Sequence, residues 1–259
     1  MGRVFLGDAL RPMPALQFHN LTLGYDRHPA VHHLDGTVET GALVAVVGPN
    51  GAGKSTLFKG ITGVLRPLSG SIERDGREAR DIAYLPQVPD IDRTFPIDVY
   101  DMVAMGLWRK KGLFGGIGRK DHRIIETAIA TVGLTGFEER AIGTLSGGQM
   151  QRMLFARVLV QDARVIVLDE PFTAIDERTA ADLLNLVQRW HGEQRTVVAA
   201  LHDIDLVKAN FPKTLLLARE PVAWGSTVEV LTPENLAKAR HMCEAFDEEA
   251  AACAVPEMA

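Results

Sequence analysis

The sequence has few of the features that mark secreted or membrane-spanning chains. Its 259 residues include two cysteines, Cys243 and Cys253, both near the C-terminal end. Such a small number provides no disulfide framework and suits a reducing compartment. No apolar run approaches the ~18 residues that a membrane-spanning helix needs, and the first residues lack the apolar core and cleavage site of a secretory signal. We therefore expect a soluble, cytoplasmic protein whose role at a membrane would depend on a partner.

The chain also lacks an excess of positive charge. Its 28 Lys and Arg residues against 33 Asp and Glu residues give a net charge of −5 at pH 7, which argues against nucleic acid as the main partner. There is no internal repeat, low-complexity segment or long heptad run. A hydrophobic content of 46% is ordinary for a globular protein. The length allows one large α/β domain, or a domain with a smaller lobe.

A glycine-rich segment predicts a phosphate-binding loop. Residues 48–56 follow an apolar segment, 42–47, that we expect to be a buried strand. The glycines let several backbone N–H groups point at one anion, Lys54 can reach the outer phosphates, and Ser55 offers a hydroxyl to Mg²⁺. The helix that begins there directs its positive dipole end at the same phosphates. This pattern arises by chance in roughly one chain in a hundred of this size. The predicted nucleotide-binding residues are Gly48, Pro49, Asn50, Gly51, Ala52, Gly53, Lys54, Ser55 and Thr56.

Strand and helix patterns alternate along the chain. Residues 15–26 largely alternate apolar and polar, as in strands, and residues 54–65 have helical spacing. Continuous apolar runs, as expected of strands covered on both faces, occupy 42–47, 164–168 and 196–201. A turn at Asp75-Gly76 predicts a hairpin. Between about residues 95 and 160 helical patterns replace strands, so we expect a helical insertion within an α/β frame that has a parallel sheet.

Two acidic residues follow the apolar run 164–168. Carboxylates at the C-terminal end of a buried strand lie where open α/β sheets bind ligands. Asp169 can hold Mg²⁺, directly or through water, and Glu170 is placed to orient or deprotonate the water that attacks the γ-phosphate. A helix cap would have a similar pattern, but the phosphate loop upstream favours the catalytic interpretation.

A second glycine turn, Leu145-Ser-Gly-Gly-Gln149, precedes a predicted helix over 150–159. Such a turn forms an anion site from backbone N–H groups and the Ser146 hydroxyl. The pentapeptide resembles the signature sequence of the ATP-binding cassette (ABC) ATPases. In that family two copies pack head to tail, and each signature closes over the ATP on the other copy's phosphate loop. The resemblance implies a homodimer in which the partner's ATP is contacted by Ser146, Gly147, Gly148 and Gln149.

Further motifs in the same order extend the resemblance over nearly the whole chain. Tyr25 resembles the aromatic residue that stacks on adenine, although a strand aromatic without a ligand is the alternative. Gln87 resembles the glutamine that contacts Mg²⁺ and links the site to the helical lobe. The loop 173–176, which ends at Asp176, is similar to the loop that crosses the dimer interface, with Thr and Ile where the family usually has Ser and Leu. His202 resembles the switch histidine that touches the γ-phosphate.

The resemblance implies an ABC ATPase fold and an ATP-hydrolysing activity that uses ATP and Mg²⁺. The implied fold is an α/β P-loop core with a mostly parallel sheet, an N-terminal antiparallel β subdomain and an inserted helical subdomain. We expect a single domain over 14–240, with helices inserted at about 90–160, and a flexible tail over 241–259. The implied catalytic residues are Lys54, Glu170 and His202, and the implied Mg²⁺ ligands are Ser55, Gln87 and Asp169.

The segment 91–106, together with 145–152 and 202–203, is most similar to zinc and manganese uptake ATPases. This implies an importer subunit on the cytoplasmic face of the inner membrane, docked on a separate permease that an extracytoplasmic solute-binding protein supplies. The alternatives are the ATPase of a metal-chelate importer, of an exporter or lipoprotein-release system, or a soluble non-transport ABC ATPase. The last is disfavoured because the chain has no tandem cassette, coiled-coil insertion or basic surplus.

Three clusters have less specific patterns. The basic residues of 109–111 and 119–120, near Trp108 and Phe114, could approach anionic lipid, but a solvated loop is the favoured interpretation. The His, Met, Cys and acidic residues of 241–249 with Cys253 could bind a regulatory metal, but no recognised ligand spacing occurs, so an acidic tail is favoured. The histidines at 28, 32 and 33 are expected in a turn.

Overall fold

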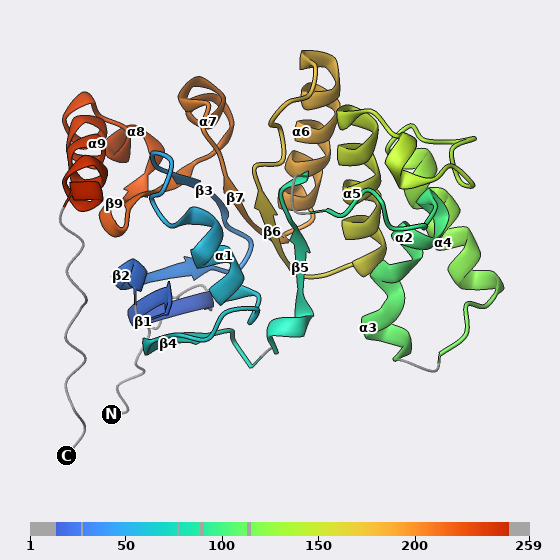
Figure 1. Ribbon diagram of the computed structural model, residues 1–259, viewed down its shortest axis with the longest axis horizontal. Coiled ribbons are helices and arrows are strands. Elements are labelled where there is room, and N and C mark those ends of the chain that lie inside the picture. The colour runs from blue at the N-terminus through green and yellow to red at the C-terminus, as the bar shows by residue number, and fades with distance from the viewer. Residues whose placement is uncertain (1–13, 27, 77, 89–90, 113–114, 249–259) are drawn as a thin grey trace, which may run out of the picture.

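Two β-sheets and the helices around them form the part of the chain that the computed structural model describes, residues 14–26, 28–76, 78–88, 91–112 and 115–248. The helical insertion lies at one end of the molecule and the antiparallel sheet at the other, with the larger sheet between them (Figure 1). Among the described residues, none of the helices combines the length and apolar character that crossing a bilayer requires.

The larger sheet has six strands in the order β5-β6-β7-β3-β8-β9. Its strands are β3 (Leu43–Val47), β5 (Ile82–Leu85), β6 (Val165–Asp169), β7 (Thr196–Ala200), β8 (Lys213–Ala218) and β9 (Glu220–Ser226). All neighbours are parallel except β8 and β9. This confirms the predicted mostly parallel sheet. Because β3, β6 and β7 are adjacent and parallel, the segments that follow them emerge at the same edge of the sheet.

The smaller sheet is antiparallel, in the order β2-β1-β4, with β1 (Pro14–Tyr25), β2 (His28–Glu39) and β4 (Ser69–Glu73). The predicted hairpin across Asp75-Gly76 was wrong. Both residues have positive φ, as in a turn, but β4 pairs with β1, and β5 pairs with β6 in the other sheet. The difference follows from burial, since β4 is mostly exposed whereas β5 is mostly buried between layers. A turn signal predicts a reversal of the chain, not the partner of the next strand.

Nine α-helices accompany the sheets in the described part of the chain: α1 (Lys54–Ile61), α2 (Val99–Ala104), α3 (Trp108–Lys111), α4 (Arg119–Thr131), α5 (Gly147–Gln161), α6 (Glu177–Gly192), α7 (Ile204–Asn210), α8 (Thr227–Val230) and α9 (Pro233–Glu248). Helices α2 to α5 lie between β5 and β6 in the chain, as expected of a helical insertion. At the start of α9, the Thr232 hydroxyl accepts a hydrogen bond from Asn235 N (3.2 Å), as an N-cap residue does. This helix continues through 241–248, and the boundaries proposed from sequence remain a prediction.

The hydrophobic core lies on both faces of the six-stranded sheet. Alternate residues of β3 face opposite sides, so Leu43, Ala45 and Val47 belong to one apolar cluster, and Val44 and Val46 to the other. The first cluster continues into the helical insertion and α6, and the second into α1 and the antiparallel sheet. This core therefore holds the edge of β3, β6 and β7 fixed relative to the helices on both sides.

Candidate active site

The glycine-rich loop connects β3 to α1. Gly51 and Gly53 have φ of 77° and 92°, in the left-handed region that favours glycine. A Cβ atom on Gly53 would also lie 2.3 Å from Ala30 O, so a side chain there is sterically excluded. No side chain caps α1 at its N-cap residue, which leaves the N–H groups of its first turn to bind an anion. The Lys54 ammonium donates to Gly48 O (2.8 Å) and Pro49 O (3.0 Å), which holds its charge inside the loop.

Three predicted metal ligands come together beside this loop. Gln87 Nε2 lies 3.3 Å from Ser55 Oγ and 3.5 Å from Asp169 Oδ1. Asp169, at the end of β6, is fully buried. Burial raises the pKa of its carboxyl, and hydrogen bonds from Ser55 and Gln87 offset part of that shift. A cation nearby would favour the ionised carboxylate.

The chemistry of this donor set fits Mg²⁺. Hydroxyl, carboxamide and carboxylate oxygens are the hard ligands that Mg²⁺ prefers. The O and N atoms of a carboxamide are assigned from their hydrogen bonds, so Gln87 can turn its oxygen toward a cation. Tyr84 Oη also donates to Asp169 Oδ2 (3.4 Å), which orients the carboxylate from the neighbouring strand β5.

Glu170 and His202 lie together at the ends of β6 and β7. His202 Nε2 forms a hydrogen bond with Glu170 Oε1, and Thr173 Oγ1 donates to Glu170 Oε2 (3.4 Å). These residues and Phe172 line a cavity of about 110 Å³. Glu170 has φ of 50°, a left-handed conformation that costs about 1–3 kcal/mol for a residue with a side chain. The surrounding structure therefore has to hold Glu170 in a strained backbone conformation.

The predicted signature turn forms the N-terminus of α5, in the helical insertion. Ser146 Oγ accepts from Gln149 N (3.2 Å), and Gln149 Oε1 accepts from Ser146 N (3.0 Å), so the two residues form a capping box on α5. Strands β5 and β6 stand between α1 and α5 (Figure 1). Within one copy of the chain, the helix that this turn begins therefore packs on the opposite face of the sheet from the helix that follows the phosphate loop.

Two further predicted residues are positioned as follows. Asp176 is the N-cap of α6 and accepts from Thr179 N (2.9 Å), a bond that lowers the pKa of the Asp176 carboxyl. Tyr25 ends β1 with 46% of its surface exposed, and the Lys59 ammonium of α1 lies 5.9 Å from its ring centroid. The ring is therefore beside the helix that follows the phosphate loop, and adenine stacking stays a prediction.

Sequence reasoning gave no role to three residues that contact this site or its supports. Tyr84 orients Asp169, as described above. Gln151 Nε2 donates to Pro171 O (2.7 Å), and Arg157 Nη2 donates to Tyr84 O (3.1 Å). Both belong to α5, and both are polar residues within the largely apolar stretch 150–160. Polar residues at positions that helical spacing assigns to the core would have been the signal.

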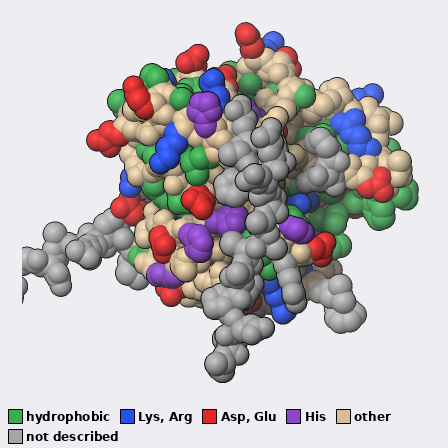
Figure 2. All heavy atoms as spheres, turned by 60° about the vertical axis from the view of Figure 1, so that its left-hand side comes forward, with side chains coloured by type: hydrophobic (Ala, Val, Ile, Leu, Met, Phe, Trp, Pro, Cys, Tyr) green, Lys and Arg blue, Asp and Glu red, His purple; other side chains and the backbone are tan. Residues whose placement is uncertain are grey.

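The less specific clusters gain no ligand site. In the basic region, Lys111 pairs with Asp121 (2.6 Å) and Lys110 with Asp162 (3.5 Å), so intramolecular partners neutralise part of its charge, and Phe114 lies outside the described residues. Figure 2 shows histidines gathered on one face. The described residues contain no group of three or more His, Cys, Asp or Glu arranged to bind a metal ion, and Cys253 lies outside them.

The expectation that His28, His32 and His33 lie in a turn was wrong, because all three belong to β2. The pairing of β1 with β2 shifts register between Leu21 and Leu23. His33, at φ of 46°, occupies this irregularity and bonds Asn20 Oδ1 (2.7 Å). The strand accommodates His33 through this irregularity.

The parallel sheet, the glycine loop and the buried carboxylate beside it define a P-loop ATPase. The sequence profile described as ABC transporter matches residues 31–173. The manganese transport system ATP-binding protein MntB of Listeria innocua is 37% identical over 85% of this chain and 94% of its own length. The zinc transport system ATP-binding protein TroB of Treponema pallidum is 38% identical over 87% of this chain and 86% of its own.

Comparison with solved structures leads to the same family. A transporter described as of the metal-chelate ABC type, in an inward-facing conformation, superposes with a TM-score of 0.78 and 32% identity, over 88% of this chain and 90% of that one. An ADP-bound cassette of an ABC transporter, 21% identical over 88% of this chain and 99% of that one, has a TM-score of 0.74 and shares the fold. The chain therefore belongs to the ABC transporter family, as an ATP-binding ATPase. The predicted family, fold class and activity are confirmed.

Proposed function

We propose that this chain is the ATPase subunit of an importer of a divalent metal ion such as manganese or zinc. The observation that carries the hydrolytic part is the convergence of Ser55, Gln87 and Asp169 beside the phosphate loop, with Glu170 and His202 paired at the same sheet edge. The cargo is supported by the relatives named above, which are manganese and zinc transport proteins.

In the proposed mechanism, positioning and electrostatics supply most of the catalysis. Loop N–H groups and Lys54 bind the β- and γ-phosphates of ATP. Mg²⁺, held by Ser55, Gln87 and Asp169, would neutralise phosphate charge. Glu170 orients the attacking water and accepts its proton, and the hydrogen bond from His202 keeps the Glu170 carboxylate facing the cavity.

We further propose that the working unit is a homodimer. The Ser146–Gln149 turn begins a 15-residue helix, and its first two residues, Ser146 and Gly147, are exposed, so a second copy of the chain could use the N–H groups of the turn as an anion site. Each phosphate loop would then be completed by the signature turn of the partner copy. Hydrolysis would depend on closure of the two copies on ATP.

The proposed partners are a membrane permease and an extracytoplasmic solute-binding protein, with the ATPase at the cytoplasmic face of the inner membrane. Phe95 has 60% of its surface exposed and begins the segment that resembles metal importers. In the proposed complex, a contact with the permease would cover this side chain.

The cargo is tested with a deletion strain, complemented either by the wild-type gene or by its Glu170→Gln variant. We expect uptake of radioactive manganese or zinc to be restored only by the wild type. Unchanged uptake of both metals in the deletion strain would reject the cargo. The ATPase assignment would stand if the purified wild-type chain hydrolysed ATP and its Glu170→Gln variant did not.

A further inference from the structure

One buried side chain of α5 contacts the segment that carries Glu170. Gln151 is 1% exposed, and its Nε2 donates to Pro171 O at 2.7 Å. A carbonyl oxygen can only accept, so this contact determines which way the carboxamide points. Within the described residues, Gln151 Oε1 is buried without a hydrogen-bond partner. This buried carboxamide therefore makes a single hydrogen bond, and its acceptor is the carbonyl of the residue directly after Glu170.

The segment 170–174, which accepts this bond, has a strained backbone that neighbouring residues must stabilise. Glu170 and Ala174 both have positive φ, 50° and 57°. Proline has no N–H to donate, which leaves the Pro171 carbonyl as the polar backbone group directly after Glu170. Within the turn, Thr173 N bonds Glu170 O at 3.3 Å, a longer contact than the one that Gln151 makes.

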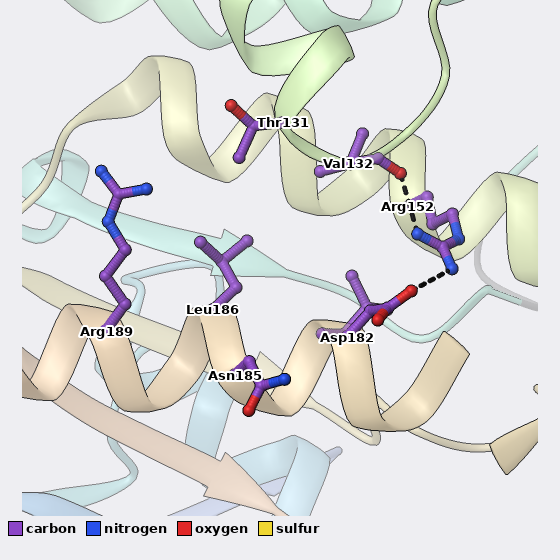
Figure 3. A pocket seen from close by; sticks show the side chains of 8 residues that line it. Thr131, Val132, Arg152, Asp182, Asn185, Leu186 and Arg189 are labelled. Atoms are coloured by element: carbon purple, nitrogen blue, oxygen red, sulfur yellow. Dashed lines mark hydrogen bonds and ion pairs between the residues drawn. The ribbon is translucent and has the colours of Figure 1, made fainter. Parts of the chain in front are cut away.

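Helix α5 is itself firmly anchored, so it can serve as a support. The rings of Phe155 and Trp190 stack with centroids 5.8 Å apart. Arg152 donates to Val132 O (3.0 Å) and to Asp182 Oδ2 (2.9 Å) beside a pocket of about 210 Å³, which ties α5 to the end of α4 and to α6 (Figure 3).

The first turn of α5 also lies close to the segment after Glu170. A Cβ atom on Gly147 would lie 3.4 Å from Ala174 O, and one on Gly148 would lie 3.8 Å from Asp176 Oδ2. The signature turn and Gln151 thus both lie beside the same segment, the turn near its end and Gln151 at its start.

We propose that Gln151 is a positioning residue for ATP hydrolysis. Its carboxamide holds the Pro171 carbonyl, and thereby keeps the Glu170 carboxylate directed at His202 and the attacking water. Because Gln151 belongs to the helix that begins with the signature turn, the orientation of Glu170 is tied to the position of that turn in the same chain. This inference rests on the proposed hydrolytic mechanism.

The test compares Gln151→Met with Gln161→Met in the purified full chain. Gln161 is a matched control, since it lies on the same helix and its Oε1 is also buried without a partner among the described residues. For Gln151→Met we expect kcat to fall about tenfold or more, with the KM for ATP within about twofold of wild type, because an interaction that serves the transition state is lost. We expect the control to keep both constants.

A folded Gln151→Met protein with wild-type kcat would overturn the proposal, as would an equal loss in Gln161→Met. If Gln151→Met does not fold, Gln151→Asn keeps the polar group but is one methylene too short for the contact, and the same loss of kcat is expected. The Glu170→Gln variant distinguishes failure of the proposed hydrolytic mechanism from failure of the role proposed for Gln151. Retained turnover in Glu170→Gln rejects the proposed mechanism, whereas loss there with full activity in Gln151→Met rejects the role of Gln151 alone.

Mixed dimers tell whether Gln151 acts within its own chain. In a dimer with one Glu170→Gln copy, hydrolysis depends on the copy that keeps Glu170. Gln151→Met should lower turnover about tenfold when it is in that copy, and leave turnover unchanged when it is in the Glu170→Gln copy. The reverse pattern would mean that Gln151 acts through the signature turn on the partner's ATP, and would overturn the proposal.

Discussion

The two glycine turns of this chain both open a helix, but they differ in how the helix N-terminus is satisfied. At α1, the N-cap is Gly53 in a left-handed conformation without a side-chain cap, and a buried lysine lies inside the loop. At α5, Ser146 and Gln149 cap the helix reciprocally. The first turn lies in the sheet edge beside Asp169, whereas the second begins the long helix of the insertion.

In the proposed dimer, this difference would let one sequence provide two anion sites for one nucleotide. The uncapped α1 turn presents its N–H groups and a cation to phosphate within a single chain. The α5 turn is held by its own capping box, and Ser146 and Gly147 are exposed, so a partner copy could bind against it. In the proposed dimer, the first turn would determine whether ATP binds, and the second would determine whether binding leads to closure and hydrolysis.

The largest effect is expected at Glu170, which would act once ATP is bound between the two turns. Glu170→Gln should lower turnover about 10³-fold, because the general base is lost, while ATP binding is retained. Size-exclusion chromatography with ATP should reveal a stable dimer, since the two turns remain intact. Wild-type turnover, or a monomer that binds ATP and never dimerises, would contradict the comparison.

The second prediction separates the two turns directly. Lys54→Ala should weaken ATP binding about 100-fold, through loss of charge-assisted hydrogen bonds to phosphate, whereas Ser146→Arg should bind ATP normally and hydrolyse little. Binding is measured with a fluorescent ATP analogue.

Mixing these two variants should restore activity, because a mixed dimer holds one intact loop facing one intact signature turn. Equal mixing gives about a quarter of wild-type turnover if the sites act independently. A mixture no more active than its separate components would show that the turns do not meet across a dimer.

The sequence predicted the sheet and the phosphate loop well because their signals are local. Apolar runs such as 164–168 and the glycine spacing of 48–56 specify buried strands and a tight loop from neighbouring residues alone. The family resemblance added the order of motifs, including Gln87 and His202.

The remaining features depend on contacts between residues far apart in the chain. The turn at Asp75-Gly76 could not reveal that β5 pairs with β6 some 80 residues later. The supports of the site, Gln151 on Pro171 and Arg157 on Tyr84, join α5 to strand ends that only the fold brings near. Polar residues in apolar stretches indicate that such partners exist, but not which atoms they contact.

A smaller effect is expected at Tyr25, which lies outside both turns. If its ring stacks on adenine, Tyr25→Ala should weaken ATP binding about fivefold to tenfold, at the lower end of a stacking energy of about 1–3 kcal/mol, because the ring is partly exposed. Tyr25→Phe keeps the ring and should bind as wild type does. A loss of GTP binding equal to the loss of ATP binding would still support stacking, whereas unchanged binding in Tyr25→Ala would reject it.

The smallest effect is expected on the stability of the protein, through the buried Asp169 beside the phosphate loop. Because burial raises the pKa of Asp169, the folded protein binds that proton more tightly than the unfolded chain does. The free energy of unfolding attributable to Asp169 therefore falls as the pH rises from the unfolded pKa through the folded pKa, and stays lower above it. Asp169→Asn removes this ionisation. Without nucleotide or Mg²⁺, its Tm should exceed that of wild type at pH 8 by roughly 2–4 °C for each kcal/mol removed, and should approach wild type at low pH. A Tm difference independent of pH would mean that packing, not charge, distinguishes the two proteins.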